Sequence, residues 1–433
     1  MTTTQDTSIY STALDSLMDA QKLPAGVVLK KQVAINQFEQ LGLPSMKHEE
    51  WKYTYLAKIL KKGFVPGYIQ TDKAVLKSIA DQLPAIAKDA NRIVLVDGIF
   101  SSELSQINAS EQYIITSLSN SWNLEISTAI DLFSSLTKGR KQALTALNTA
   151  LCQDGVFIEV SENGSAHVEL LLVQTGQEKI SMPRFVIHVG QDAYLNIAEQ
   201  YLLLDGQSLS NSVSEVFLDA SAKVEWVKIQ DAAEQSYQMD SCYVVQAKKS
   251  NYHCSTISLT GELLRNNQFI QIAGEEAHAN LGGVYILDGQ QQADNLIVIE
   301  HASPNATSNQ LYKGILDGKS TGVFNGKIVV VEDAQKTNAF QSNKNILLSD
   351  DAAAYFRPQL EIFADDVKCS HGATSAQIED HELFYLRSRG IGKELSKSLL
   401  MFAYVGDVID EIEDTTLREW VKSRIASKLK IEL

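Results

Sequence analysis

A cysteine and a histidine stand two residues apart in the segment Val367–Gly372, at Cys369 and His371. If this segment is extended, residues i and i+2 point to the same face, so the thiol and the imidazole lie side by side. A thiolate and an imidazole together can bind iron or zinc. Two ligands do not complete a metal site, so a distant part of the chain or another subunit would supply the rest. The alternative is structural: Cys369 is then a small buried apolar residue and His371 a hydrogen-bonded turn residue.

The other motifs are weaker. Gly314–Ser320 resembles a phosphate-binding P-loop, but only three residues separate Gly314 from Gly318, where a P-loop needs four. Strand-like residues follow instead of a helix, so we expect a turn here and no nucleotide bound by this chain. His253 and Cys254 are adjacent, so in a strand their side chains face opposite ways. Acidic residues are too many for a catalytic carboxylate pair to stand out.

Composition limits the class of protein. The 433 residues carry a formal charge of −15, with a pI near 5.0. This excess of acid disfavours binding to nucleic acid or to anionic membranes. No apolar run is long enough to span a bilayer, and Met1–Asp6 lacks the basic and apolar regions of a secretory leader. We therefore expect a cytoplasmic protein with reduced thiols, since its cysteines form no CxxC pair: Cys152, Cys242, Cys254 and Cys369.

The candidate pair lies at the end of a region with a regular repeat. Short polar turns follow apolar, strand-like segments and start at residues 161, 190, 219, 247, 274, 301, 332 and 364, at intervals of 27 to 32 residues. A unit of this size cannot bury its own apolar face, so stacking of successive units is expected. The spacing predicts a β-solenoid, most simply a parallel β-helix. An antiparallel sandwich with evenly spaced hairpins is the alternative.

Helical patterns precede this region. Apolar residues recur at spacings of three and four over Ile9–Met18, Val27–Leu41 and Lys138–Leu151. Ile93–Val96 is a short apolar run that ends in the turn signal Asp97-Gly98, which indicates a buried strand.

Helical patterns also follow the region with the regular repeat. Asp380–Arg389 is amphipathic, and Gly390 stands where a left-handed C-cap is expected. Lys393–Ile409 and Thr416–Leu429 continue the pattern, and Thr416 with Glu419 matches a capping box. The predicted plan is a mostly helical region over residues 1–151, a β-helix over 152–374 and a helical region over 375–433.

Five long segments carry recognisable motifs: Gly42–Thr54, Asn305–Ile328, Ala334–Ser349, Pro358–Thr374 and Phe384–Gly390. Together they resemble the SufB/SufD family of iron–sulfur cluster assembly proteins. The amino-acid sequence around Cys369 and His371 is most similar to that of the SufD members. His381 departs from the family, which commonly has an acidic or polar residue there.

The resemblance has implications for fold and function. It implies a right-handed parallel β-helix and a non-catalytic scaffold that pairs with a SufB-like paralogue through the β-helix. A SufC-like ABC ATPase would bind the C-terminal helices, which accounts for the missing P-loop. His371 matches a histidine at the interface where a nascent iron–sulfur cluster or iron is held, and Cys369 matches a nearby cysteine. The metal would then be shared with the partner chain. The isolated protein is expected to be able to form a homodimer.

Two other functions remain open from the sequence. One is a β-helix carbohydrate-active lyase or hydrolase that uses surface carboxylates. The other is a purely structural homo-oligomer without metal.

Overall fold

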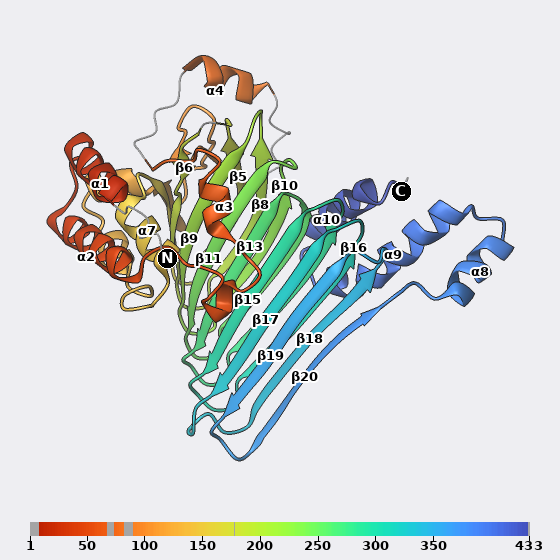
Figure 1. Cartoon of the computed structure of the whole chain (residues 1–433). Helices are drawn as coiled ribbons and strands as arrows, with labels where there is room; N and C mark the ends of the chain where they lie inside the picture. The colour runs from red at the N-terminus through yellow and green to blue at the C-terminus, as the bar shows by residue number, and fades with distance from the viewer. Residues whose placement is uncertain (1–7, 67–72, 82–89, 177, 432–433) are drawn as a thin grey trace.

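The computed structural model describes residues 8–66, 73–81, 90–176 and 178–431. Its centre is a solenoid in which successive strands alternate between two sheets (Figure 1). The β20 sheet, named after its last strand, has the spatial order β2 (Ile99–Phe100), β1 (Asn91–Val96), β5 (Ser165–Gln174), β8 (Tyr194–Leu203), β10 (Lys223–Asp231), β12 (Asn251–Thr260), β14 (His278–Leu287), β16 (Thr307–Leu316), β18 (Thr337–Leu347), β20 (Val367–Ala376). The β19 sheet has the order β19 (Ala353–Ile362), β17 (Thr321–Val330), β15 (Gln292–His301), β13 (Leu263–Ile272), β11 (Ser236–Gln246), β9 (Ser208–Leu218), β7 (Arg184–Val189), β4 (Gly155–Val160), β3 (Tyr113–Ser117), with β6 (Ile180–Ser181) beside β9.

The strands of successive turns pair in parallel. In the β20 sheet, for example, β14 pairs with β16 and β16 with β18 without a shift in register, and β13 pairs with β15 in the same way in the β19 sheet. Antiparallel pairing occurs at the beginning of the solenoid, between β1 and β2 and between β3 and β4. This pattern confirms the predicted parallel β-helix, and the antiparallel sandwich was the wrong alternative.

The predicted turns lie between consecutive strands, although the one placed at residue 301 starts one residue early because His301 ends β15. Seven of these turns hold a non-glycine residue at positive φ, which costs roughly 1–2 kcal/mol each for an L-residue. A backbone ladder offsets this cost, because each such N–H donates to a carbonyl of the next turn, as Asp192 does to Ala220 at 3.0 Å. The seven residues are Asn163, Asp192, Ser221, Lys249, Glu276, Asn305 and Lys336.

Alternate residues of the strands fill the inside of the solenoid. Val224 and Trp226 of β10 face Cys242 and Val244 of β11 in one apolar cluster that extends from the first rung towards the last. The intervening residues of β10, such as Val227, point outward and are also buried, because the C-terminal helices cover that face.

The predicted N-terminal helices are present at the start of the solenoid (Figure 1). α1 (Ser8–Ala20) and α2 (Ala25–Leu41) match the predicted ranges, whereas α7 (Ala143–Leu151) begins later than predicted, after Gly139 at φ +75°. The described part of this region also contains five short helices: η1 (Glu49–Trp51), α3 (Leu56–Leu60), α4 (Lys73–Ala80), α5 (Leu118–Asn123) and α6 (Ser127–Leu132).

The predicted strand at Ile93–Val96 is β1, and it pairs with β5 as part of the β20 sheet. The solenoid therefore begins within the region predicted as mostly helical, while the division of the chain at residues 151 and 374 stays a prediction. Met1–Asp6, from which the absence of a leader was predicted, lie outside the described residues.

The C-terminal helices are α8 (Asp380–Ser388), α9 (Lys393–Asp410) and α10 (Thr415–Lys428), as predicted, and Gly390 has the expected positive φ. The capping box at Thr416 was wrong. Asp414 is the N-cap, and its carboxylate accepts the N–H groups of Thr416 and Leu417 at 2.8 and 3.0 Å. Within the described ranges, no helix combines the length and the apolar character needed to cross a membrane.

Candidate functional site

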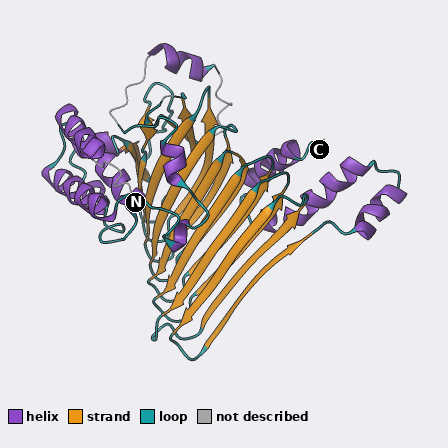
Figure 2. Cartoon of the chain, viewed as in Figure 1, coloured by secondary structure: helices purple, strands orange, loops and turns teal. Residues whose placement is uncertain are grey.

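The solenoid ends in two open strand edges. β19 pairs with β17 and β20 pairs with β18, and no described strand lies on the other side of either one. Figure 2 shows the stacked strands running up to this end, where the chain leaves β20 for the C-terminal helices. An open edge leaves backbone N–H and C=O groups unpaired, which makes it a template for strands of another chain.

Cys369 and His371 both lie on β20, opposite Ala339 and Gln341 of β18. Cys369 is half-buried against the apolar cluster that closes the interior, which includes Ile328. Because side chains alternate along a strand, His371 stands on the same face as Cys369, and it is exposed.

Burial raises the pKa of the Cys369 thiol above its usual value, and the backbone hydrogen bond from Ala339 offsets only part of this effect. In the isolated chain the group is therefore a neutral thiol at pH 7. A bound metal ion or a cation from another chain would be needed to convert it to the thiolate that binds iron.

No third ligand joins this pair within the described part of the chain, where no group of three or more histidine, cysteine or carboxylate side chains could hold a metal ion. His381, the departure from the family, lies in α8 and pairs with Glu379 at 2.9 Å on the surface. The assignment of Cys369 and His371 as metal ligands stays a prediction that requires ligands from another chain.

Comparison with known proteins identifies the family. The model for the SUF system FeS cluster assembly SufBD core domain matches residues 172–404, and the model for the SufBD protein N-terminal region matches residues 4–170. The chain belongs to the SufBD family. A SufBD family iron–sulfur cluster assembly protein of Synechocystis is 31% identical over 436 residues, which cover 95% of this chain and 94% of the relative. The iron–sulfur cluster assembly protein SufD of Escherichia coli is 28% identical over 407 residues, 92% of each chain.

The remaining cysteines of this SufBD chain lie away from the open end. Cys242 and Cys254 are fully buried inside the solenoid, and burial raises the pKa of Cys242 to about 12. Cys254 points inward while His253 lies outside near Glu225, so the two neighbours form no ligand pair, as predicted from their adjacency.

The turn that resembles a P-loop connects β16 to β17, and no helix follows it. Residues 318–322 also fit the pattern G-x-S-x-G of a nucleophile elbow. Ser320 is fully buried, however, and its Oγ donates to the carbonyl of Leu287 at 3.3 Å. A strand–turn–strand geometry with a buried serine supports neither a phosphate site nor a nucleophile.

Sequence reasoning missed two buried ionic groups. Inside the solenoid, the Lys228 ammonium lies 2.6 Å from Asp240 and 3.9 Å from Glu199. Burial alone would lower the pKa of Lys228, but the two carboxylates outweigh it and raise that pKa well above its usual value. Burial also raises the pKa of Glu199 to about 7.

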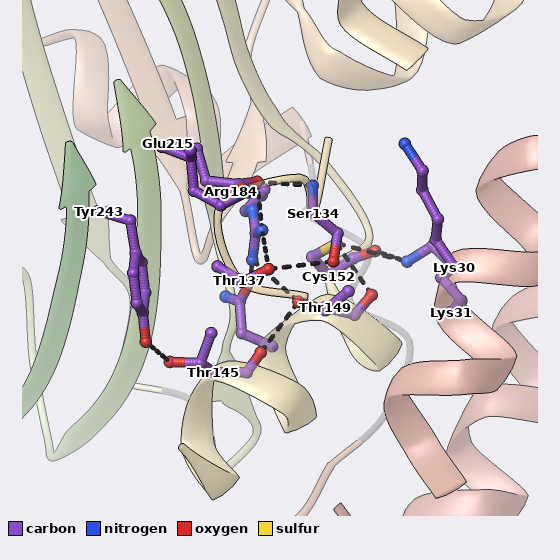
Figure 3. A network of polar contacts seen from close by, with 12 residues as sticks. Lys30, Lys31, Ser134, Thr137, Thr145, Thr149, Cys152, Arg184, Glu215 and Tyr243 are labelled. Carbon is purple, nitrogen blue, oxygen red and sulfur yellow. Dashed lines mark hydrogen bonds and ion pairs between the residues drawn. The ribbon is translucent and has the colours of Figure 1, made fainter. Parts of the chain in front are cut away.

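The second group ties the N-terminal region to the solenoid (Figure 3). Arg184 and Glu215 form a fully buried ion pair at 2.5 Å, and Arg184 also donates to Thr149 of α7. Lys31 of α2 is fully buried nearby and donates to the carbonyl of Cys152 at 2.6 Å, close to the end of α7. Each cation satisfies backbone or carboxylate acceptors of the fold, which accounts for these residues without a catalytic role.

The C-terminal helices divide into a packed part and a projecting part. The second half of α9 and α10 cover the outer face of the β20 sheet, where Val408 and Ile425 join Val227 and Ile257 in one apolar cluster. Lys313 reinforces this contact through an ion pair to Asp407 at 2.7 Å.

α8, in contrast, has no buried residue and extends away from the solenoid (Figure 1). Phe384 and Tyr385 of α8 are 73% and 58% exposed, and Leu395 at the start of α9 is 46% exposed. Large apolar groups gathered on a projecting element are typical of a surface that another protein covers.

Proposed function

We propose that this chain is a non-catalytic scaffold subunit of an iron–sulfur cluster assembly complex. Its β19 and β20 edges pair with a SufB-like paralogue, and Cys369 and His371 contribute ligands to a nascent cluster that the partner completes. One observation carries this proposal. Two open strand edges coincide with a thiol and an imidazole that have no further ligands among the described residues. Backbone pairing at an open edge supplies affinity, and the side chains beside it supply specificity.

The same proposal places a SufC-like ABC ATPase on α8 and the first half of α9. The exposed Phe384, Tyr385 and Leu395 supply the apolar anchors for this contact. β20 continues into α8 through the short link Gln377–Glu379, so movement of α8 by the ATPase would reach the strand that carries the cluster ligands. A cross-link that fixed the SufB-like partner to β20 and still allowed cluster assembly would count against this coupling.

Co-purification tests the complex. A tagged full-length chain is expected to retain untagged SufB-like and SufC-like proteins. Deletion of everything beyond Thr374 is a poor test, because it would uncover the apolar cluster under α9 and α10. The variant Phe384→Ala/Tyr385→Ala changes only exposed side chains. It should lose the ATPase and keep the SufB-like partner, and loss of neither would contradict the assignment of α8.

The comparisons give no support to the predicted carbohydrate-active alternative. A homodimer through the same edges is an outcome that size-exclusion chromatography of the isolated chain would detect.

A further inference from the structure

A short N-terminal segment crosses the outside of the β19 sheet. This strap, residues Glu49–Thr54, comprises η1 and the turn that follows it. It lies along one row of outward-facing residues that are aligned by register on four strands. The row consists of Arg265 on β13, Asp294 on β15, Val323 on β17 and Tyr355 on β19.

The strap is anchored on two inner strands of the sheet. The Arg265 guanidinium lies over the Trp51 ring at 3.9 Å and donates to the carbonyl of Glu50 at 2.8 Å. Arg265 is 1% exposed and pairs with Asp294 at 2.5 Å, and Asp294 also accepts from the Thr54 hydroxyl. A charged hydrogen-bonded group of this kind, buried beneath an indole, fixes the strap firmly to β13 and β15.

From this anchor the strap reaches the edge strand. The Tyr53 ring stacks on Tyr355 of β19, with centroids 4.2 Å apart and planes inclined by 12°. Glu49 forms an ion pair with Arg357 of the same strand. Two aromatic residues of the strap, Trp51 and Tyr53, therefore pack against side chains of the β19 sheet.

β20 has no equivalent support. Among the described residues, no side chain of Val367–Ala376 forms an ion pair or a ring stack with another element, and most of this strand is exposed. The two open edges therefore differ. β19 is strapped from outside, whereas β20 is held by its ladder to β18 and by the packing of Val367 and Cys369 on the interior cluster.

We propose that the strap fixes β19 as a rigid docking edge for the partner and leaves β20, with Cys369 and His371, free to adjust. The docking half of this inference rests on the function proposed above. A preformed edge lowers the ordering cost of association, because the partner meets a strand already in its bound conformation. The separate freedom of β20 allows the ligand-bearing strand to move without loss of the docked edge.

Amide hydrogen exchange of the isolated full-length chain tests the strap without any partner. In Tyr53→Ala/Glu49→Gln we expect amides of Ala353–Ile362 to exchange roughly five- to tenfold faster, the range expected for an exposed ring stack and an exposed ion pair. Exchange in β13 and the melting temperature should stay unchanged. Tyr53→Phe keeps the ring and should behave as wild type. Tyr55→Ala is the matched control, because Tyr55 is 49% exposed and lies just beyond the strap.

Unchanged amide exchange in β19, or an equal effect of Tyr55→Ala, would refute the inference that the strap holds β19. The docking half is tested by the dissociation constant for the SufB-like partner, which should rise several-fold in the double variant and not in Tyr55→Ala. Faster exchange with unchanged affinity would overturn the docking role. If wild-type protein forms no complex, the proposed function fails, while the exchange experiment still decides whether the strap holds β19.

Discussion

Removal of the buried ammonium of Lys228 should destabilise the solenoid strongly. Lys228 and its two carboxylate neighbours are each at most 4% exposed, so water cannot replace the lost cation. In Lys228→Met the Asp240 carboxylate keeps, among the residues that the structure describes, only the hydroxyl of Ser212, at 2.8 Å, as a close side-chain donor. Breaking a buried ion pair by removing one partner typically costs about 3–5 kcal/mol, far more than loss of an exposed pair.

Denaturant unfolding followed by tryptophan fluorescence measures this loss, because Trp226 lies beneath the Lys228 ammonium at 4.2 Å. The control is Lys228→Met/Asp240→Leu, which replaces the pair by apolar groups and should recover most of the stability. A loss below about 1 kcal/mol in the single variant would refute the reasoning, because it would show that the charges are effectively solvated.

Three further predictions follow from the buried and exposed groups. Burial holds the pKa of Glu199 near 7 in the folded state, whereas its pKa in the unfolded chain is well below that. The unfolding free energy should therefore fall as pH rises from 5 to 8, by about 3 kcal/mol from this group. Thermal melts across this pH range should show a smaller pH dependence of stability in Glu199→Gln, and a pH dependence identical to that of wild type would contradict the prediction. Arg184→Met leaves Glu215 buried without its cation, so the free energy of unfolding should fall by roughly 3–5 kcal/mol. Proteolysis at the α2–α7 contact should become faster, and an unchanged cleavage rate would contradict the anchoring role of this network. Phe384→Ala/Tyr385→Ala should weaken ATPase capture in a pull-down at least tenfold without change in melting temperature, since both rings are exposed and act only in binding.

The repeat was predictable because rung geometry leaves a trace in turn placement. Each rung needs one strand on each sheet and two turns, so polar turn residues recur at a nearly constant interval even where residue identity does not. The helices were predictable from apolar spacing, although the N-cap of α10 was not, because Asp414 competes with Thr416 and only the backbone conformation decides between them.

The buried ions were not predictable from the pattern. In β10 both faces are apolar: Val224 and Trp226 point inward, while Val227 and Ile229 point outward beneath the C-terminal helices. Alternation therefore cannot tell which face Lys228 occupies or that a carboxylate on another strand meets it. The strap was hidden for a similar reason, since Trp51 meets Arg265 across more than two hundred residues of chain.

The pairing of Cys369 and His371 on one strand was accessible from their spacing, but the open edge beside them was not. That edge exists because the chain leaves β20 for α8 instead of adding another rung, and no local sequence signal states whether a further strand covers it.

The most direct test of the proposed shared site is anaerobic reconstitution of the complex with iron and sulfide. Wild type, His371→Ala and the control His381→Ala would each be assembled with SufB-like and SufC-like partners and checked for intact complex by size exclusion. Cluster yield from the absorption spectrum should fall severalfold in His371→Ala and stay at the wild-type level in His381→Ala, whose imidazole lies on the surface of α8. An equal cluster yield in His371→Ala and wild type, with the complex intact, would contradict the proposal that this imidazole helps to hold the nascent cluster.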